Sequence, residues 1–190
     1  ELLTVTRPDV VAALHDSFFR VGCDAVETNT FGSFGVVLAE YAIPERAFEL
    51  SRAGAAIARE VAHGYSTDGR RRYVVGSIGP GTKLPSLGAI TYPELRDQYE
   101  VMVDGLLEGG VDVLLVETVQ DLLQGKAALA ACRRAMARAG REVPLMIQVT
   151  VETTGRLLIG SEIGAALTAL DALRPDVFGL NCATGPAEMT

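Results

Sequence analysis

The stretch VDVLLVET, residues 111–118, is a short apolar run that turns polar at Glu117 and Thr118. Runs of this length that are rich in Val and Leu are typical of strands in a parallel sheet covered on both faces. Four more such runs lie on either side of it along the chain: DAVETNTF at 24–31, YVVGSIGP at 73–80, LMIQVTV at 145–151 and VFGLNC at 177–182. The sequence therefore predicts five strands.

Helical patterns separate these strands, and several carry recognisable end signals. Thr91 and Glu94 form a T-x-x-E capping box at the start of one helix. The alanine-rich segment that begins at residue 121 is expected to end at Gly140, with arginines in its last turns, where the helix dipole favours them. Ser161 is a candidate N-cap for the helix that follows.

Strands that alternate with helices predict an α/β fold with a parallel sheet. Two architectures fit this pattern: a (β/α)8 barrel and a doubly wound open sheet. A complete barrel takes about 250 residues, whereas the chain has 190. The pattern alone leaves the choice open.

Composition excludes several classes of partner. The net charge of −7 argues against nucleic-acid binding, which requires a basic surface. No apolar run approaches the roughly 20 residues that span a bilayer, so no membrane partner is expected. The first residues have neither the basic nor the apolar region of a secretory signal. The chain's 3 cysteines have no short spacing and predict no disulfide framework, which favours a reducing, cytoplasmic location.

Polar residues cluster where the predicted strands end. In both candidate architectures, binding and catalytic groups lie beyond the carboxyl ends of the parallel strands, so these residues should meet at one mouth. They are Glu27, Thr28, Asn29, Thr30, Ser77, Gly79, Glu117, Thr118, Gln148, Thr150, Asn181 and Cys182.

Glu117 follows a buried run, where an unpaired charge would be costly. Its carboxylate could bind a substrate amine or act as a general base. It could equally be a structural group that pairs with an arginine or with backbone N–H groups.

Cys182 also has two interpretations. A thiolate held at a strand end can bind zinc or act as a nucleophile, but a single cysteine is more often a small buried hydrophobic residue. The other cysteines and both histidines are interpreted as packing or surface residues: Cys23, Cys132, His15 and His63.

GSIGPGTK, residues 76–83, superficially resembles a phosphate-binding loop. The P-loop pattern requires Lys before Ser or Thr, whereas Thr82 here precedes Lys83, and Pro80 lacks an N–H donor. We therefore interpret the segment as a glycine-rich turn that lets the backbone approach a ligand closely.

Several segments together resemble the homocysteine S-methyltransferase family. They are GCDAVETNTFGS, YVVGSIGPGTK, EGGVDVLLVETVQDLLQGKAAL, TGRLLIGS and GLNCATGP, and they occur in the family's order along the whole chain. ETNTFG, GSIGP and LLVET are most similar to the cobalamin-dependent members. The resemblance implies a (β/α)8 barrel, with residues 1–190 forming a partial homocysteine-binding domain that covers about strands two to six. The first barrel unit and the last two are expected to lie outside these residues.

The same resemblance implies a zinc ion held by three cysteine thiolates. Cys182, in GLNC, matches the first of these ligands, whereas the family's adjacent Cys-Cys pair has no match in this sequence. Glu117 matches the family's glutamate that binds the homocysteine amino group. The matching polar residues that line the substrate pocket are Asn29, Thr30, Ser77, Gly79 and Asn181.

The implied activity is methyl transfer to the sulfur of homocysteine, which forms methionine. In the cobalamin-dependent reaction the zinc-activated homocysteine thiolate attacks methylcobalamin on a separate domain, and a folate domain supplies the methyl group. We expect these 190 residues to be inactive alone. Two alternatives stay open: a stand-alone methyltransferase that uses S-methylmethionine or another sulfonium donor, and a non-catalytic barrel piece that acts as a binding module.

Overall fold

The structure is a computed structural model that describes residues 1–67, 69–187 and 189. It contains the five predicted strands: β1 (Ala25–Glu27), β2 (Tyr73–Ile78), β3 (Val113–Val119), β4 (Leu145–Val149) and β5 (Val177–Leu180). They form one sheet in chain order, and each neighbouring pair is parallel. The prediction of a parallel α/β fold is confirmed.

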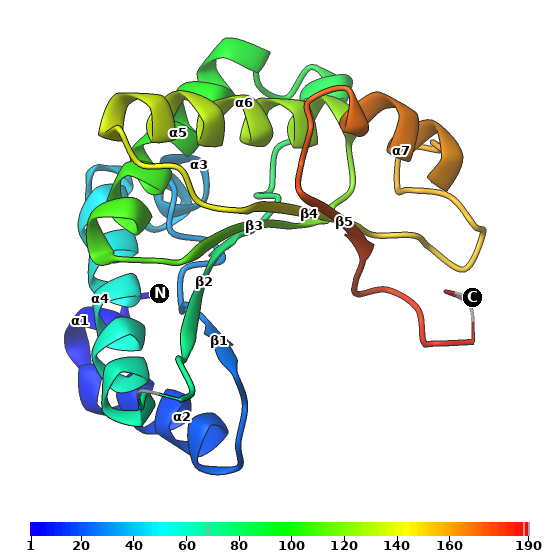
Figure 1. The fold of residues 1–190 in the computed structure, drawn as a ribbon. Coiled ribbons are helices and arrows are strands. Elements are labelled where there is room, and N and C mark those ends of the chain that lie inside the picture. The colour runs from blue at the N-terminus through cyan, green and yellow to red at the C-terminus, as the bar shows by residue number, and fades with distance from the viewer. Residues whose placement is uncertain (68, 188, 190) are drawn as a thin grey trace.

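The sheet curves into an arc, and the long helices lie along its convex side (Figure 1). These helices are α2 (Pro8–Arg20), α4 (Ala47–Tyr65), α5 (Tyr92–Gly109), α6 (Leu122–Ala139) and α7 (Ile163–Asp171). Shorter elements complete the described chain: α1 (Leu3–Thr6), α3 (Gly35–Leu38), η1 (Ala39–Tyr41), η2 (Pro44–Arg46) and η3 (Pro85–Leu87). A doubly wound sheet carries helices on both faces, whereas a barrel carries them on its outer face only. The arrangement is therefore that of an incomplete (β/α)8 barrel.

Most helix ends follow the local sequence signals. The Thr91 side chain accepts a hydrogen bond from the Glu94 N–H at the start of α5, and Gly140 adopts the left-handed conformation after α6. The predicted cap at Ser161 is wrong, because α7 begins one residue later, with Glu162 in the N-cap position. The Glu162 side chain instead forms an ion pair with Arg156 across a short bridge between these two residues.

The expectation that both faces of the strands are covered is met in β3, where residues 114–119 are all buried, but not in β4. In β4, Leu145, Ile147 and Val149 are fully buried against the helices, whereas Met146 and Gln148 between them stay partly exposed. This alternation arises because successive side chains of a strand point to opposite faces. The concave face carries none of the described helices, and on β4 the side chains of that face stay partly exposed (Figure 1).

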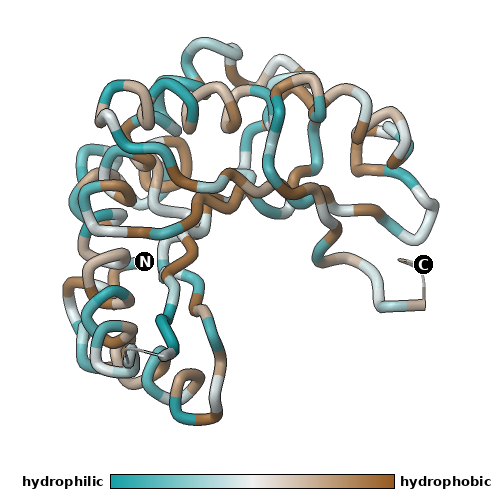
Figure 2. The backbone as a smooth tube through the Cα atoms, in the orientation of Figure 1, coloured by the Kyte–Doolittle hydropathy of each residue, from teal (hydrophilic) through white to brown (hydrophobic). Residues whose placement is uncertain are grey.

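The core lies between the sheet and its helices. Hydrophobic residues run along the strands in the middle of the arc, while the peripheral loops are more hydrophilic (Figure 2). Among the residues that the structure describes, no helix is both long enough and apolar enough to cross a membrane.

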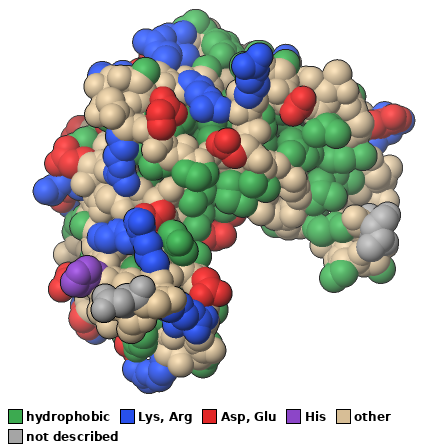
Figure 3. Space-filling view, viewed as in Figure 1, with side chains coloured by type: hydrophobic (Ala, Val, Ile, Leu, Met, Phe, Trp, Pro, Cys, Tyr) green, Lys and Arg blue, Asp and Glu red, His purple; other side chains and the backbone are tan. Residues whose placement is uncertain are grey.

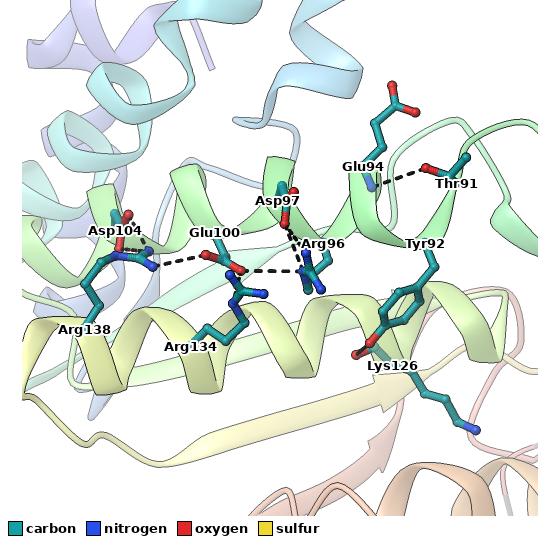
Figure 4. A network of polar contacts seen from close by, with 10 residues as sticks. All are labelled: Thr91, Tyr92, Glu94, Arg96, Asp97, Glu100, Asp104, Lys126, Arg134 and Arg138. Atoms are coloured by element: carbon teal, nitrogen blue, oxygen red, sulfur yellow. Dashed lines mark hydrogen bonds and ion pairs between the residues drawn. The ribbon is translucent and has the colours of Figure 1, made fainter.

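Glu100 on α5 lies at the centre of an ion-pair network between α5 and α6 (Figure 4). Its side chain is nearly buried and contacts Arg96, Arg134 and Arg138, and Arg138 also pairs with Asp104. A carboxylate removed from water is tolerated when several donors surround it. The network therefore ties the two helices together along their outer edge.

Close packing of α4 against α5 depends on Gly105. A Cβ atom at this position would lie 2.6 Å from the carbonyl oxygen of Phe48 and 2.9 Å from the Ser51 Cβ. We predict that Gly105→Ala lowers the free energy of unfolding by about 1–3 kcal/mol, because the helices must move apart. Gly64→Ala on α4 is the matched control: its Cβ would meet nothing within 4 Å.

Gly64→Ala should raise the free energy of unfolding by about 0.5–1 kcal/mol, because alanine favours a helix over glycine where there is space for its Cβ. Thermal unfolding followed by circular dichroism measures both changes. Equal effects of the two substitutions would contradict the packing role of Gly105.

Candidate functional site

Side chains from three strands meet at the carboxyl edge of the sheet around Glu117. Ser77, at the end of β2, donates from its hydroxyl to Glu117 Oε1 at 2.6 Å. Asn181, directly after β5, donates from Nδ2 to Glu117 Oε2 at 3.3 Å. Parallel strands place their ends at one edge, which brings residues far apart in sequence together.

The partners of Glu117 answer one question that its sequence context left open. No arginine forms an ion pair with it, and no backbone N–H donates to it, among the interactions of the described residues; both of its donors are neutral side chains. The side chain is only 9% exposed. Its negative charge is therefore solvated by two hydrogen bonds and is not neutralised by a neighbouring cation.

A bulge in β3 sets the position of Glu117. Val116 pairs with Ile147, but Val119 pairs with Val149, so β3 has one more residue than β4 in this interval. The bulge contains Thr118, whose backbone is in the left-handed conformation with a φ of 58°. Such bulges bend a strand and re-aim a side chain, and they are frequent beside functional sites. Sequence reasoning missed this feature, since a threonine gives no signal for a left-handed conformation.

Two threonines in the segment after β1 form hydrogen bonds with Ser77. Thr30 Oγ1 donates to the Ser77 carbonyl oxygen at 2.8 Å, and Thr28 Oγ1 accepts from the Ser77 N–H at 3.0 Å. The two hydroxyls are 2.6 Å apart. Since Thr30 is already a donor to Ser77, Thr28 donates to Thr30. Thr30 is fully buried, so its hydroxyl serves this chain of bonds.

Asn29 and Gly79 also have partners within the protein. Asn29 Nδ2 donates to Thr4 Oγ1 at 3.1 Å, and the Gly79 N–H donates to the Phe31 carbonyl oxygen at 3.0 Å. A Cβ on Gly79 would lie 2.6 Å from that oxygen. The close backbone approach predicted for the glycine-rich turn is thus made to Phe31. The substrate roles of Asn29, Thr30, Ser77, Gly79, Glu117 and Asn181 stay predictions.

Asp121 is a structural residue of this edge that sequence reasoning missed. It is fully buried, and its carboxylate accepts bonds from the Leu123 N–H at the start of α6 and from both the N–H and the hydroxyl of Ser86. Asp121 therefore fastens the loop after β2 to α6. Its place directly before a helical pattern was the available signal.

The concave side of the arc carries negative charge near the candidate site. Hydrophobic and acidic side chains border the hollow in the view of Figure 3. Burial raises the pKa of Glu27, at the end of β1, and the negative charge of Glu117 raises that pKa further. Two carboxyl groups thus act on each other at this edge, which favours a cationic ligand there.

Cys182 is exposed and has a free thiol, with a left-handed backbone at φ 62°. A zinc site needs three or four ligands. The described residues contain no group of at least three His, Cys, Asp or Glu side chains placed to hold a metal ion. Cys182 can supply one thiolate, so the described residues do not form a zinc site by themselves.

The other cysteines and histidines match the packing interpretation in their surroundings. Cys132 is fully buried, and burial raises the pKa of its thiol to about 12. His15 is buried, burial lowers its pKa, and its Nε2 has no hydrogen-bond partner among the described residues. It lines a pocket of about 340 Å³ between α2 and β1, and Glu27 also lines this pocket. Cys23 is half-buried, and His63 is exposed.

The fold and the polar strand ends can now be compared with those of known protein families. The profile of the homocysteine S-methyltransferase family matches residues 1–190, and the chain belongs to this family. It is 57% identical over 190 residues to a methionine synthase of Mycobacterium tuberculosis and 54% identical to a methionine synthase of Mycobacterium leprae. Each alignment covers the whole chain and 16% of the relative.

Solved structures share the fold. The apo form of the homocysteine methyltransferase MmuM from Escherichia coli matches with a TM-score of 0.73 and 20% identity, covering 98% of this chain and 66% of that one. Its metallated form matches with a TM-score of 0.70 and 16% identity, covering 98% of this chain and 84% of that one. At this identity the likeness supports the barrel architecture.

The three cysteines should differ in their rates of reaction with a thiol reagent. With a chelator present, we predict that iodoacetamide modifies Cys182 first and Cys132 last, because a thiolate is the reactive form and Cys132 is both buried and protonated. Mass spectrometry of peptides from the folded protein measures the order. Equal modification rates would contradict it, and denaturant should expose Cys132.

The coupling between the two carboxyl groups can be measured by titration. We predict that Glu117→Gln lowers the pKa of Glu27, since removing a like charge eases ionisation, while burial keeps that pKa above its ordinary value. Carboxyl-carbon NMR resonances, assigned with Glu27→Gln, give the measurement. Glu94→Gln is the control, because Glu94 is not among the charges that shift Glu27. An unchanged Glu27 titration in Glu117→Gln would rule out the coupling.

Proposed function

We propose that the protein carrying this chain transfers a methyl group to the sulfur of homocysteine and forms methionine, with these residues as its homocysteine-binding part. The observation that carries the proposal is Glu117, a carboxylate with two neutral donors and no cationic partner among the described residues. The identity of 57% to a methionine synthase supports it.

In this proposal Glu117 binds the homocysteine ammonium group. A buried carboxylate that has hydrogen bonds but no counter-ion attracts a cation strongly, because the surroundings screen the charge poorly. Ser77 and Asn181 keep both carboxylate oxygens oriented, and the negative charge of Glu117 adds to burial in raising the pKa of Glu27. The amino acid end of the substrate is thereby held at the strand edge.

Cys182 is proposed as one zinc ligand. Cys182 follows β5, and the carboxyl ends of parallel strands lie at one edge of a sheet, which supports a shared site with Glu117. The other ligands are expected from outside the described residues. A zinc ion held by thiolates would lower the pKa of a substrate thiol and favour its nucleophilic form. All three cysteines are free, so the Cys182 thiol is available as a ligand.

The methyl donor belongs to the proposal as well. Methylcobalamin on a separate domain, with a folate domain as the source of the methyl group, is the donor system that the resemblance implies. The relatives are about six times longer than the stretch they share with this chain, since it covers 16% of each. The described residues alone are therefore expected to bind but not to turn over homocysteine.

Cys182→Ala tests the zinc assignment in the full-length gene product. We predict loss of both bound zinc and homocysteine turnover, because removing one thiolate from a three-thiolate site leaves too few ligands. Metal analysis and a methionine assay measure the two quantities. Cys23→Ala is the matched control and should keep both. If Cys182→Ala retains its zinc and its turnover, the assignment is wrong.

A further inference from the structure

The side chain of Asn181 has no hydrogen-bonding capacity left for a ligand. One Nδ2 proton is donated to Glu117 Oε2 at 3.3 Å, and the other to Thr118 Oγ1 at 2.9 Å. Its Oδ1 accepts from the Thr118 N–H at 3.0 Å and from Thr150 Oγ1 at 3.4 Å. A primary amide offers two protons and two lone pairs, so all four are used within the protein.

The orientation of this amide follows from its partners. The Thr118 N–H can only donate, so an oxygen must face it, and an ionised Glu117 can only accept, so a nitrogen must face that carboxylate. Both constraints select the same orientation of the Asn181 side chain. A flipped amide would place like groups against each other on both sides.

The bulge of β3 explains why the amide is needed. The additional residue in β3 leaves the Thr118 N–H without a ladder partner on β4, and Asn181 Oδ1, from the residue after β5, accepts its hydrogen bond instead. The Asn181 N–H itself bonds to the Val149 carbonyl oxygen at 3.3 Å, which holds its backbone in the β5 register. Asn181 therefore caps a left-handed residue that would otherwise have an unpaired buried donor.

We infer that Asn181 is a positioning residue, which orients the Glu117 carboxylate through the β3 bulge and makes no contact of its own with substrate. The inference rests on the proposed function, in which Glu117 binds the substrate's amino group. The inference gives the two residues different roles: Glu117 contacts the ligand, and Asn181 holds Glu117 in place.

The test compares homocysteine with 4-mercaptobutanoate, the same molecule without its amino group. In the full-length gene product, Asn181→Ala should weaken homocysteine binding about tenfold, as expected for the loss of a hydrogen bond to a charged group. Binding of 4-mercaptobutanoate should change little, because Asn181 acts only through the residue that holds the amino group. A residue that merely supports the fold would weaken both ligands alike. Titration calorimetry measures both affinities.

A double-mutant cycle with Glu117→Gln gives the second readout. Asn181→Ala should have much less effect on homocysteine affinity in the Glu117→Gln background, because a residue that acts through Glu117 is coupled to it. Additive effects, or an equal loss for both ligands, would overturn the inference. If Glu117→Gln alone leaves homocysteine affinity unchanged, the proposed role of Glu117 fails instead, and the two failures are thereby distinguished.

Folding is controlled with a second variant. Thr118→Gly tolerates a positive φ without strain, so Thr118→Gly/Asn181→Ala should keep the bulge without its amide cap. Circular dichroism and thermal unfolding check each protein. If the pair folds and retains full homocysteine affinity, Asn181 is not needed to position Glu117.

Discussion

The organisation of the candidate site depends on the burial of one negative charge. Glu117 lies near the end of β3, after a run of buried residues, and an ionised carboxylate there requires donors that its own strand does not supply. Ser77 and Asn181 provide them from β2 and β5, so the need of one side chain connects the ends of three strands. Thr28 and Thr30 then hold Ser77 in place from β1.

The curvature of the sheet makes this convergence possible. The strands follow one another in chain order with all long helices on the convex side, and because they are parallel their carboxyl ends lie at one edge of the curved sheet (Figure 1). Helix contacts maintain that curvature: Gly105 lets α5 approach α4, and the Glu100 network joins α5 to α6 (Figure 4). The long helices pack on the convex face and leave the concave face free for polar side chains.

Much of the fold could be predicted because its signals are local. Apolar runs locate all five strands, Thr91 with Glu94 marks the start of α5, and Gly140 marks the end of α6. The site was predictable only as a set of polar strand ends. The β3 bulge was missed because it depends on the mismatch in register between β3 and β4. The predicted cap at Ser161 was wrong: α7 begins at Ile163, and the preceding Glu162 pairs with Arg156 across the loop.

The sequence by itself determined the order of strands and helices, the polar character of the strand ends and the family resemblance that identifies Cys182 and Glu117 as candidates. These properties depend on residue type and on neighbours along the chain. Only the tertiary structure decided that Glu117 has neutral partners, that Thr118 is left-handed and that the Asn181 amide is fully occupied. Each of these properties depends on hydrogen bonds between residues 31 to 64 positions apart in sequence, which no local pattern can encode.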